Sequence, residues 1–340
     1  VIYSTKYLKI IKFLMREFLM RLLYLQRDFI KYLKNVSYFQ HKESKGFYED
    51  NFKNYYIDFK VKHTLKNKTG IPSLYIVESD KYIIFPGMVI QWLLGMLQLY
   101  QEDNEMLKKE ILLARDWLIE NIEKNYFIPN NFKLLDPEMN IKNDNSAMTS
   151  FMIISALVRL NYINLISTDK TIYLCKKIAD FALKSDEKKG ACLMIDKDVI
   201  LQEYTYIDNN IVLNGWIFSI LGLYDLINFL KNNDDTRDYE NYEKIMILSQ
   251  KTFLKYIDNF ISEDNWSFYD TKKRKSSPNY HQLHILLLSV LIDLNIISDN
   301  RVINIKMRWE KSYKNTFKKI KYIIFKIFKK IFDKQLYSTL

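Results

Sequence analysis

Apolar residues recur at the spacing of one helical face along most of this chain, and polar loops separate the runs. The pattern predicts a series of helices, at residues 86–100, 104–123, 146–163, 168–184, 210–229, 239–259 and 280–294. Pro86 is well placed to open the first helix, and Asn104 is a good N-cap for the second. Helical hairpins whose loops carry the polar residues favour a mainly α fold, an α/α-barrel (toroid) with functional residues at the loop end.

Shorter stretches alternate apolar and polar residues as strands do. Residues 55–59 alternate in this way, and residues 75–77 with 82–85 predict a short β-hairpin. Residues 190–206 predict a pair of strands, and residues 267–269 one more short strand. We therefore expect short β-hairpins within the helical fold and a small β-containing N-terminal part.

Both ends of the chain combine a helical apolar pattern with many basic residues. Residues 3–34 carry a charge about every fourth position, which disfavours a signal peptide and a transmembrane span. From Phe317 onward, apolar residues follow the 3.6-residue period and lysines occupy the positions between them. Each of these helices is expected either to lie on an anionic membrane surface or to pack on the protein itself.

The net charge of +11 is concentrated at these ends. Residues 301–340 hold 12 Lys and Arg against 2 acids, residues 1–35 hold 8 against 2, and residues 36–300 are left with −5. An enzyme of nucleic acids would spread basic residues over its main domain, so we expect no nucleic-acid partner. We divide the chain into an amphipathic basic N-terminal helix (1–45), a β-containing segment with the first helix (46–100), an α/α-barrel domain (101–315) and a basic amphipathic C-terminal helix (316–340).

Cysteine and histidine are scarce. The two cysteines, Cys175 and Cys192, provide no disulfide framework and lie in apolar surroundings, which indicates core positions and a reducing compartment. Of four histidines only His281 and His284 are close in sequence, so we expect no metal centre.

The stretch from Glu203 to Asp225 combines an acid, a phenol and a helix that keeps Gly215 and Gly222. The chain has only seven glycines, and a glycine inside a helix costs about 1 kcal/mol relative to alanine. Two turns apart, the two glycines lie on roughly one face, where they allow close approach of another helix or of a ligand.

Three segments concentrate side chains that can move protons or hold anions: Glu203-Tyr204, residues 269–274 and residues 280–284. Each alone also fits a plain structural role, as a solvated face, a basic loop or a helix surface. Together they suit removal of a proton from a carbon next to a carboxylate, which needs a base, an acid on the opposite face and cations that hold the carboxylate. Glu203, Tyr280 and either Lys272 or Arg274 can supply these groups.

The same segments resemble the C-terminal domain of the D-glucuronyl C5-epimerases, which convert glucuronate to iduronate within heparan-type polysaccharides. The resemblance rests on short blocks in one order, namely Asn145–Met148, Ile154–Arg159, Glu203-Tyr204, Val212–Asp225, Tyr269-Asp270, Tyr280–Ile285 and Arg308–Tyr313. It covers residues 145–313, with a thinner match over residues 55–100.

The resemblance implies a two-base mechanism without a redox cofactor or a metal. The implied catalytic residues are Glu203, Tyr204 and Tyr280, with Glu203 and Tyr280 on opposite faces of the uronate ring. The implied substrate-binding residues are Tyr269, Lys272, Arg274, Asn214, His281, His284, Asn145, Gln91 and Tyr82. The implied partner is an anionic, glucuronate-containing polysaccharide, which the C-terminal lysines would also attract. The sequence leaves open whether the protein forms a homodimer and whether it contacts a membrane peripherally. We expect a cytoplasmic location, at the inner face of the membrane, for a bacterial protein and the Golgi lumen for a eukaryotic one.

Some positions depart from the family pattern. Thr205 replaces a proline, Lys272 replaces an arginine, and residues 149–153 replace a Gly/Gln-rich run. These changes affect substrate contacts more than the proton-moving groups, so the reaction type is better supported than heparosan as the substrate. Two alternatives remain: an α/α-toroid polysaccharide lyase or uronyl hydrolase, and a non-catalytic glycan-binding scaffold.

Overall fold

The structure is a computed structural model that describes residues 54–59, 66–76, 81–100, 104–135, 138–233, 239–322 and 324. The helix predicted over residues 3–34 lies outside the described residues, and so does the C-terminal tail beyond residue 324.

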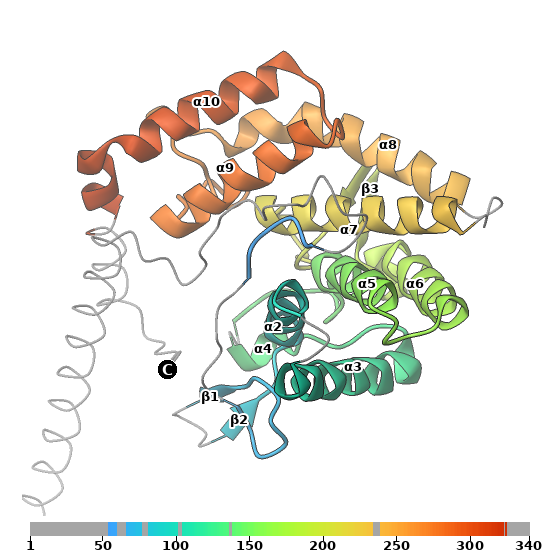
Figure 1. The fold of residues 1–340 in the computed structure, drawn as a ribbon. Coiled ribbons are helices and arrows are strands. Elements are labelled where there is room, and N and C mark those ends of the chain that lie inside the picture. The colour runs from blue at the N-terminus through green and yellow to red at the C-terminus, as the bar shows by residue number, and fades with distance from the viewer. Residues whose placement is uncertain are drawn as a thin grey trace, which may run out of the picture.

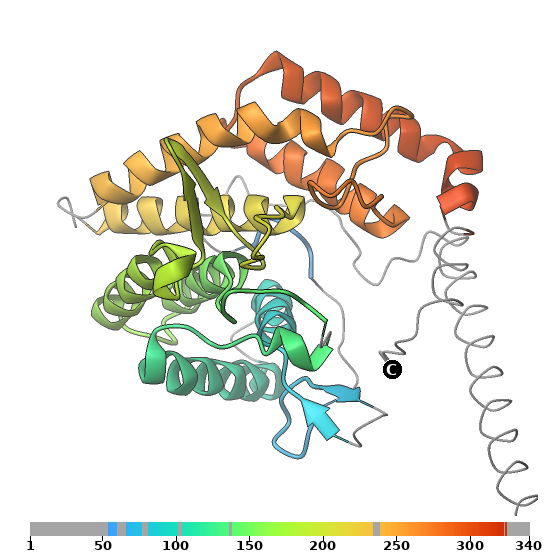
Figure 2. The ribbon, with the colours of Figure 1, turned by 180° about the vertical axis from the view of Figure 1, so that it is seen from behind.

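The chain is mainly helical, and its helices stack as hairpins in two layers (Figures 1 and 2). One layer contains α2 (Pro86–Gln98), α5 (Ala147–Tyr162), α7 (Leu213–Asn232) and α9 (Pro278–Asp293), which pack in this order. The other contains α3 (Glu105–Asn125), α6 (Thr168–Ala182), α8 (Tyr239–Tyr256) and α10 (Asn300–Lys314), each packed on its partner in the first layer. A short helix, α4 (Phe132–Leu135), and two 3-10 turns, η1 (Asp186–Lys188) and η2 (Ile257–Phe260), lie in the connections.

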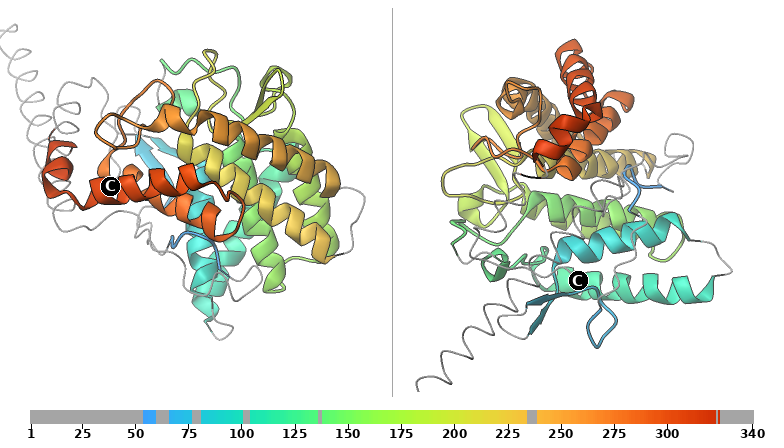
Figure 3. Two further views of the ribbon diagram at one scale, coloured as in Figure 1. Left: turned by 90° about the horizontal axis from the view of Figure 1, so that it is seen from above. Right: turned by 90° about the vertical axis from the view of Figure 1, so that its left-hand side faces the viewer.

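The stack begins at α2 and α3 and ends at α9 and α10, on opposite sides of α5 and α7 (Figures 1 and 3). The described helices therefore form an arc, and the sequence predicted the helical hairpins that compose it. Closure of that arc into a ring, which a barrel requires, stays a prediction.

The contact between α5 and α7 forms the centre of the core. A Cβ atom at Gly222 would lie 2.2 Å from the backbone oxygen of Phe151, so this glycine is required for the close approach of the two helices. By length and composition α7 could cross a membrane, but 89% of its most apolar window is buried inside the protein, as in a core helix.

Local signals placed the helix starts well. The side chain of Asn104 accepts a hydrogen bond from the backbone N–H of Leu107 at 3.0 Å and caps α3 as predicted, and Pro86 opens α2. The sequence pattern did not identify α4 or α10.

Two predicted strands are wrong. Residues 55–59 alternate in sequence but bury successive side chains and form no strand, and the amide of Gln98 donates to the backbone oxygens of Tyr55 and Ile57 (3.1 and 2.9 Å). Residues 267–269 make only isolated bridges, such as Phe268 with Lys275.

Two antiparallel hairpins accompany the helices. As predicted, β1 (Leu74–Ile76) pairs with β2 (Lys81–Ile83), and β3 (Cys192–Ile195) pairs with β4 (Asp198–Leu201). However, β4 ends before Glu203, so the Glu203-Tyr204 pair lies in the connection between β4 and α7 rather than on a strand.

The cysteines are core residues, as expected. Both are buried and free, and burial raises the pKa of the Cys192 thiol to about 12 and that of Cys175 further still.

The beginning of the predicted C-terminal helix belongs to the folded body. After α10 the chain is helical again over residues 316–322. Phe317, which was predicted to open the apolar face, is 86% exposed, whereas Tyr322 is 4% exposed. The chain therefore packs this helix through a different face from the one that the apolar period indicated.

Candidate active site

The connection that carries Glu203 is fixed to the loop before α5. The backbone N–H of Ala147 donates to the carbonyl oxygen of Gln202 at 2.8 Å. The hydroxyl of Thr205 donates to the carbonyl oxygen of Asn143 at 2.7 Å and accepts from its N–H at 3.1 Å. Thr205, where the epimerase pattern has a proline, thus anchors the loop through its side chain.

Glu203 lies against α7, where Gly215 makes room for it. A Cβ atom at position 215 would lie 2.3 Å from the Glu203 Cβ and 2.5 Å from its Oε2. The two glycines of α7 therefore differ: Gly222 admits the backbone of α5, and Gly215 admits the acid of the candidate site.

Burial dominates the electrostatics of Glu203. Its side chain is 7% exposed, and this loss of solvation raises its pKa to about 7 despite hydrogen bonds from Tyr204 and Asn214 and the charge of Arg274, which lower it. The amide Nδ2 of Asn214 donates to Oε2 at 3.2 Å. A carboxylate with this pKa can both take and release a proton near neutral pH.

Three tyrosines gather around Glu203. The hydroxyl of Tyr269 donates to Tyr204, and that of Tyr204 donates to Glu203, which forms a relay that ends on the acid. Burial first, and then the nearby charge of Glu203, raise the pKa values of Tyr204 and Tyr269 well above the usual one, so both phenols stay protonated at neutral pH. The ring of Tyr280, at the start of α9, meets that of Tyr269 edge-on at 5.2 Å and is 38% exposed.

The cation next to these groups is Arg274. Its Nε donates to the buried carboxylate of Asp270 at 2.5 Å, and its guanidinium lies 5.4 Å from the ring centre of Tyr269 and hydrogen-bonds Tyr206. Lys272, in contrast, is more than half exposed and pairs with Asp208.

The two histidines lie behind the site. His281 is fully buried, with Nδ1 2.9 Å from the hydroxyl of Ser267 and Nε2 3.2 Å from the backbone oxygen of Trp309. Burial lowers its pKa to about 3, so it is neutral, and its predicted contact with the substrate stays a prediction. His284 is also buried, with its ring 6.5 Å from that of Tyr280, which places it as a support for this tyrosine.

The remaining predicted residues separate into two groups. Asn145 is buried and bonds the backbone of its own loop and the carbonyl oxygen of Lys189 at 3.1 Å, so it holds the loop, and its predicted contact with the substrate stays a prediction. Gln91, half-buried on α2, and Tyr82, 54% exposed on β2, stay predictions.

The sequence did not single out several residues that complete the site. Phe132 of α4 packs on Tyr204 with ring centres 4.6 Å apart, and the ring centre of Tyr206 lies 5.4 Å from that of Tyr204. Asp270, read only as part of a motif, receives Arg274 and also the amide of Asn210 at 2.9 Å. The alternation of Tyr204 and Tyr206 was a usable signal, but nothing local indicates Phe132.

Comparison with known families identifies one family domain in this chain. The family model described as D-glucuronyl C5-epimerase C-terminus matches residues 128–311, which contain all the residues of the relay and of the Arg274–Asp270 pair. A search of curated proteins finds no match. Within the described part of the chain, no three His, Cys, Asp or Glu side chains gather as a metal site would require.

Proposed function

Because this chain belongs to the D-glucuronyl C5-epimerase family, we propose that it converts D-glucuronate to L-iduronate residues within an anionic polysaccharide, by removal and return of the C5 proton. The observation that carries this proposal is a buried acid with a pKa of about 7 at the end of a tyrosine relay, with one half-exposed arginine beside it.

Glu203 is the base in the proposed reaction. Its carboxylate takes the proton from C5, and the electron pair of the broken C–H bond moves into the adjacent C6 carboxylate to form an enolate-type intermediate. A pKa near 7 suits this step, since the group is partly ionised at neutral pH and still basic enough to accept a proton. The relay from Tyr269 through Tyr204 holds the carboxylate in one orientation.

Tyr280 is the acid in the proposed reaction. Its hydroxyl returns a proton to C5 from the opposite face, which inverts that carbon. The proton on Glu203 and the phenolate of Tyr280 then exchange with water, which restores the starting state. Tyr280 is the most exposed of the three tyrosines, which supports its contact with a polymer.

Arg274 holds the uronate carboxylate while negative charge grows on it. A guanidinium has five N–H donors, and Asp270 and Tyr206 leave some of them for a substrate. The proposed site uses Arg274 in the role that the family pattern assigns to an arginine at the position of Lys272.

The proposed architecture is an α/α-toroid of which the described hairpins form an arc. The connections that carry the site residues, before α7 and before α9, lie in one region, because Val212 and Asp270 form a bridge and the Leu213 N–H donates to the Tyr269 oxygen at 3.1 Å. Arg274 and Tyr280 are exposed members of this region, which supports contact with a polymer there.

The test is exchange at C5 in heavy water. Incubation of unsulfated and sulfated glucuronate polymers with the protein should place deuterium at C5, read by NMR, together with iduronate signals. An ultraviolet-absorbing unsaturated uronate would instead show a lyase, since that product requires elimination at C4. No exchange on any such polymer, with folded protein, removes the proposal and favours a binding scaffold.

Substitution of the two proposed proton carriers assigns the chemistry. Glu203→Gln should reduce deuterium exchange at C5 of glucuronate, and Tyr280→Phe should reduce the formation of iduronate, each by at least about 100-fold, the range for loss of a general acid or base. Wild-type rates of exchange and of iduronate formation in both variants would show that the residue assignment is wrong.

A further inference from the structure

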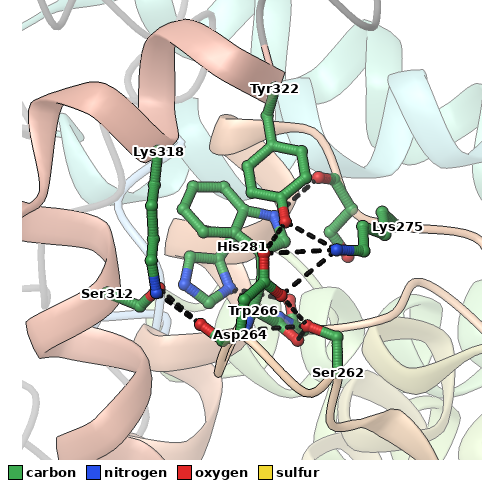
Figure 4. A network of polar contacts seen from close by, with 10 residues as sticks. Ser262, Asp264, Trp266, Lys275, His281, Ser312, Lys318 and Tyr322 are labelled. Carbon is green, nitrogen blue, oxygen red and sulfur yellow. Dashed lines mark hydrogen bonds and ion pairs between the residues drawn. The ribbon is translucent and has the colours of Figure 1, made fainter.

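The first turns of the C-terminal helix pack on the loop between η2 and α9, which carries Tyr269 and Arg274 (Figure 4). Asn315 begins this helix, because its side-chain oxygen accepts the N–H of Lys318 at 3.1 Å. The chain thereby turns after α10 so that Lys318 and Tyr322, one helical turn apart, both face the loop.

Asp264 is the centre of the contact, which we call the Asp264 cluster and which consists of Ser262, Asp264, Lys275, Lys318 and Tyr322. The carboxylate of Asp264 accepts hydrogen bonds from the Tyr322 hydroxyl and from Ser262 (2.5 Å), and it pairs with Lys275 at 3.1 Å. Lys275 also donates to the Tyr322 oxygen at 2.7 Å, and Lys318 donates to the backbone oxygen of Asp264.

An aromatic stack extends the cluster into the core. The Tyr322 ring lies 4.3 Å from that of Trp266, and Trp266 stacks on His281 at 3.9 Å and 18°. The indole N–H of Trp266 donates to the backbone oxygen of Ser276 at 2.8 Å, so this one side chain joins the two ends of the loop.

The same loop positions the groups of the proposed site. Lys275 pairs with Phe268 through a backbone bridge, and the next N–H, that of Tyr269, donates to the Arg274 oxygen at 2.6 Å. The hydroxyl of Ser267 lies 2.8 Å from Nδ1 of His284, whose ring faces Tyr280. A shift of the Asp264 cluster would therefore displace Tyr269 and Arg274 together.

We propose that Tyr322 is a positioning residue: through Asp264, Lys275 and Trp266 it fixes the loop that presents Tyr269 and Arg274 to the substrate. This inference rests on the proposed epimerase function. It assigns a role to the first turns of the C-terminal helix, which the matched family range, ending at residue 311, does not include.

The test uses Tyr322→Ala with Phe317→Ala as the matched control. Both residues are aromatic and lie on the same helix, but Phe317 is 86% exposed and Tyr322 is 4% exposed. Tyr322→Ala should lower kcat for C5 exchange by about 10- to 100-fold, since misplacement of catalytic groups by about 1 Å has effects of this size, with a smaller change in KM. Phe317→Ala should leave both unchanged. Tyr322→Phe, which keeps the ring on Trp266 and loses the hydroxyl, should lie between wild type and Tyr322→Ala.

Hydrogen exchange of backbone amides provides a readout that does not depend on activity. In Tyr322→Ala, amides of residues 262–277 should exchange faster, while those of α5 and α7 keep the wild-type rate. If the wild type is inactive on every polymer but the loop amides respond as expected, the epimerase proposal fails and the fixation of the loop stands. Unchanged loop amides in Tyr322→Ala overturn the inference. Faster loop exchange together with an unchanged kcat also overturns it, because the loop is then held without effect on catalysis.

Tyr322→Phe keeps the test decisive if Tyr322→Ala unfolds, and two truncations separate the first turns of the helix from the tail beyond them. A chain that ends at Asn315 lacks both Lys318 and Tyr322, and a chain that ends at Ile324 keeps them. The inference requires loss of kcat in the first and wild-type kcat in the second. Equal activity of the two truncated proteins contradicts it.

Discussion

Two arginine–aspartate pairs in this protein look alike in chemistry and differ in what surrounds them. Arg159 pairs with Asp225 at 2.7 Å, and both side chains are at most 2% exposed. Arg274 pairs with Asp270, whose carboxylate is equally buried, but the arginine side chain is 48% exposed.

The Arg159–Asp225 pair is closed on all sides. The guanidinium donates to the backbone oxygens of Ser155 (2.8 Å) and Asn54 (3.1 and 3.2 Å), and the hydroxyl of Tyr56 donates to the carboxylate. These contacts join α5, α7 and the buried segment at residues 54–59, so every strong donor and acceptor is used within the fold.

The Arg274–Asp270 pair uses the same chemistry but leaves its cation open. The carboxylate fixes one edge of the guanidinium, and the rest lies beside Tyr269 and faces solvent in part. The two pairs therefore differ in the exposed fraction of the arginine, and Arg274 is the one whose donors a carboxylate from solvent can reach.

The largest expected effect is on stability, from the closed pair. Arg159→Met should lower the free energy of unfolding by about 3–5 kcal/mol, because the buried Asp225 loses its cation. Urea denaturation measures this effect, with Lys124→Met as the control, since Lys124 and Glu120 form an exposed pair (57% and 71%) expected to contribute less than about 1 kcal/mol. Equal losses in the two variants would show that burial does not raise the contribution of the Arg159–Asp225 pair above that of an exposed pair.

The next effect is on catalysis, from the open pair. Arg274→Lys keeps a positive charge for Asp270 but loses the fork of donors, so kcat/KM for C5 exchange should fall by about 100-fold while the free energy of unfolding changes little. Lys272→Gln, two residues away on the exposed side of the loop, should retain most of the activity. If Lys272→Gln is the more damaged variant, the carboxylate-binding cation is Lys272.

The third and smaller expected effect is on the pH dependence of the reaction. It concerns Glu203, whose carboxylate has hydrogen bonds where Asp225 and Asp270 have an arginine. Its active form is the carboxylate and its pKa is about 7, so the exchange rate should rise with pH through about 7 and be lost below it. Asn214→Ala removes a hydrogen bond that lowers this pKa, so the midpoint of the pH–rate profile should move to higher pH, by about one unit. A midpoint that stays in place in Asn214→Ala would show that a different group titrates.

The raised pKa of Glu203 also means that folding favours the protonated acid, so any stability gained from Glu203 is lost as pH rises through about 7.

The smallest expected effect is on membrane binding, through the lysines of the tail beyond residue 324. Residues 325–340 contain four lysines and one aspartate, and each basic residue near an anionic membrane contributes about 1 kcal/mol. A chain that ends at Ile324 should lose binding to anionic liposomes relative to the full chain, and exchange on soluble polymer should be unchanged. The cut is placed after Ile324 because Tyr322 packs on the body. Liposome binding that survives the cut contradicts a membrane role for the tail.

The helices could be predicted because their signals are local. An Asn or Pro at a helix start acts on backbone groups within one turn, and the apolar period of α5, α6 and α7 is written in consecutive residues. Local signals failed at residues 55–59, where the strand-like alternation meets a fold that buries both faces and supplies Gln98 as the hydrogen-bond partner from α2.

The sequence by itself determined the set of candidate proton-moving groups, since Glu203, Tyr204, Tyr269 and Tyr280 lie in recognisable short blocks, and the structure brings them together. Only the tertiary structure decided how the neighbouring charged and polar residues divide among roles. It directs Lys272 to Asp208 and Arg274 to Asp270, encloses His281, and places Gly215 against Glu203. These outcomes depend on contacts between side chains from different elements, and no period or motif within one segment contains that information.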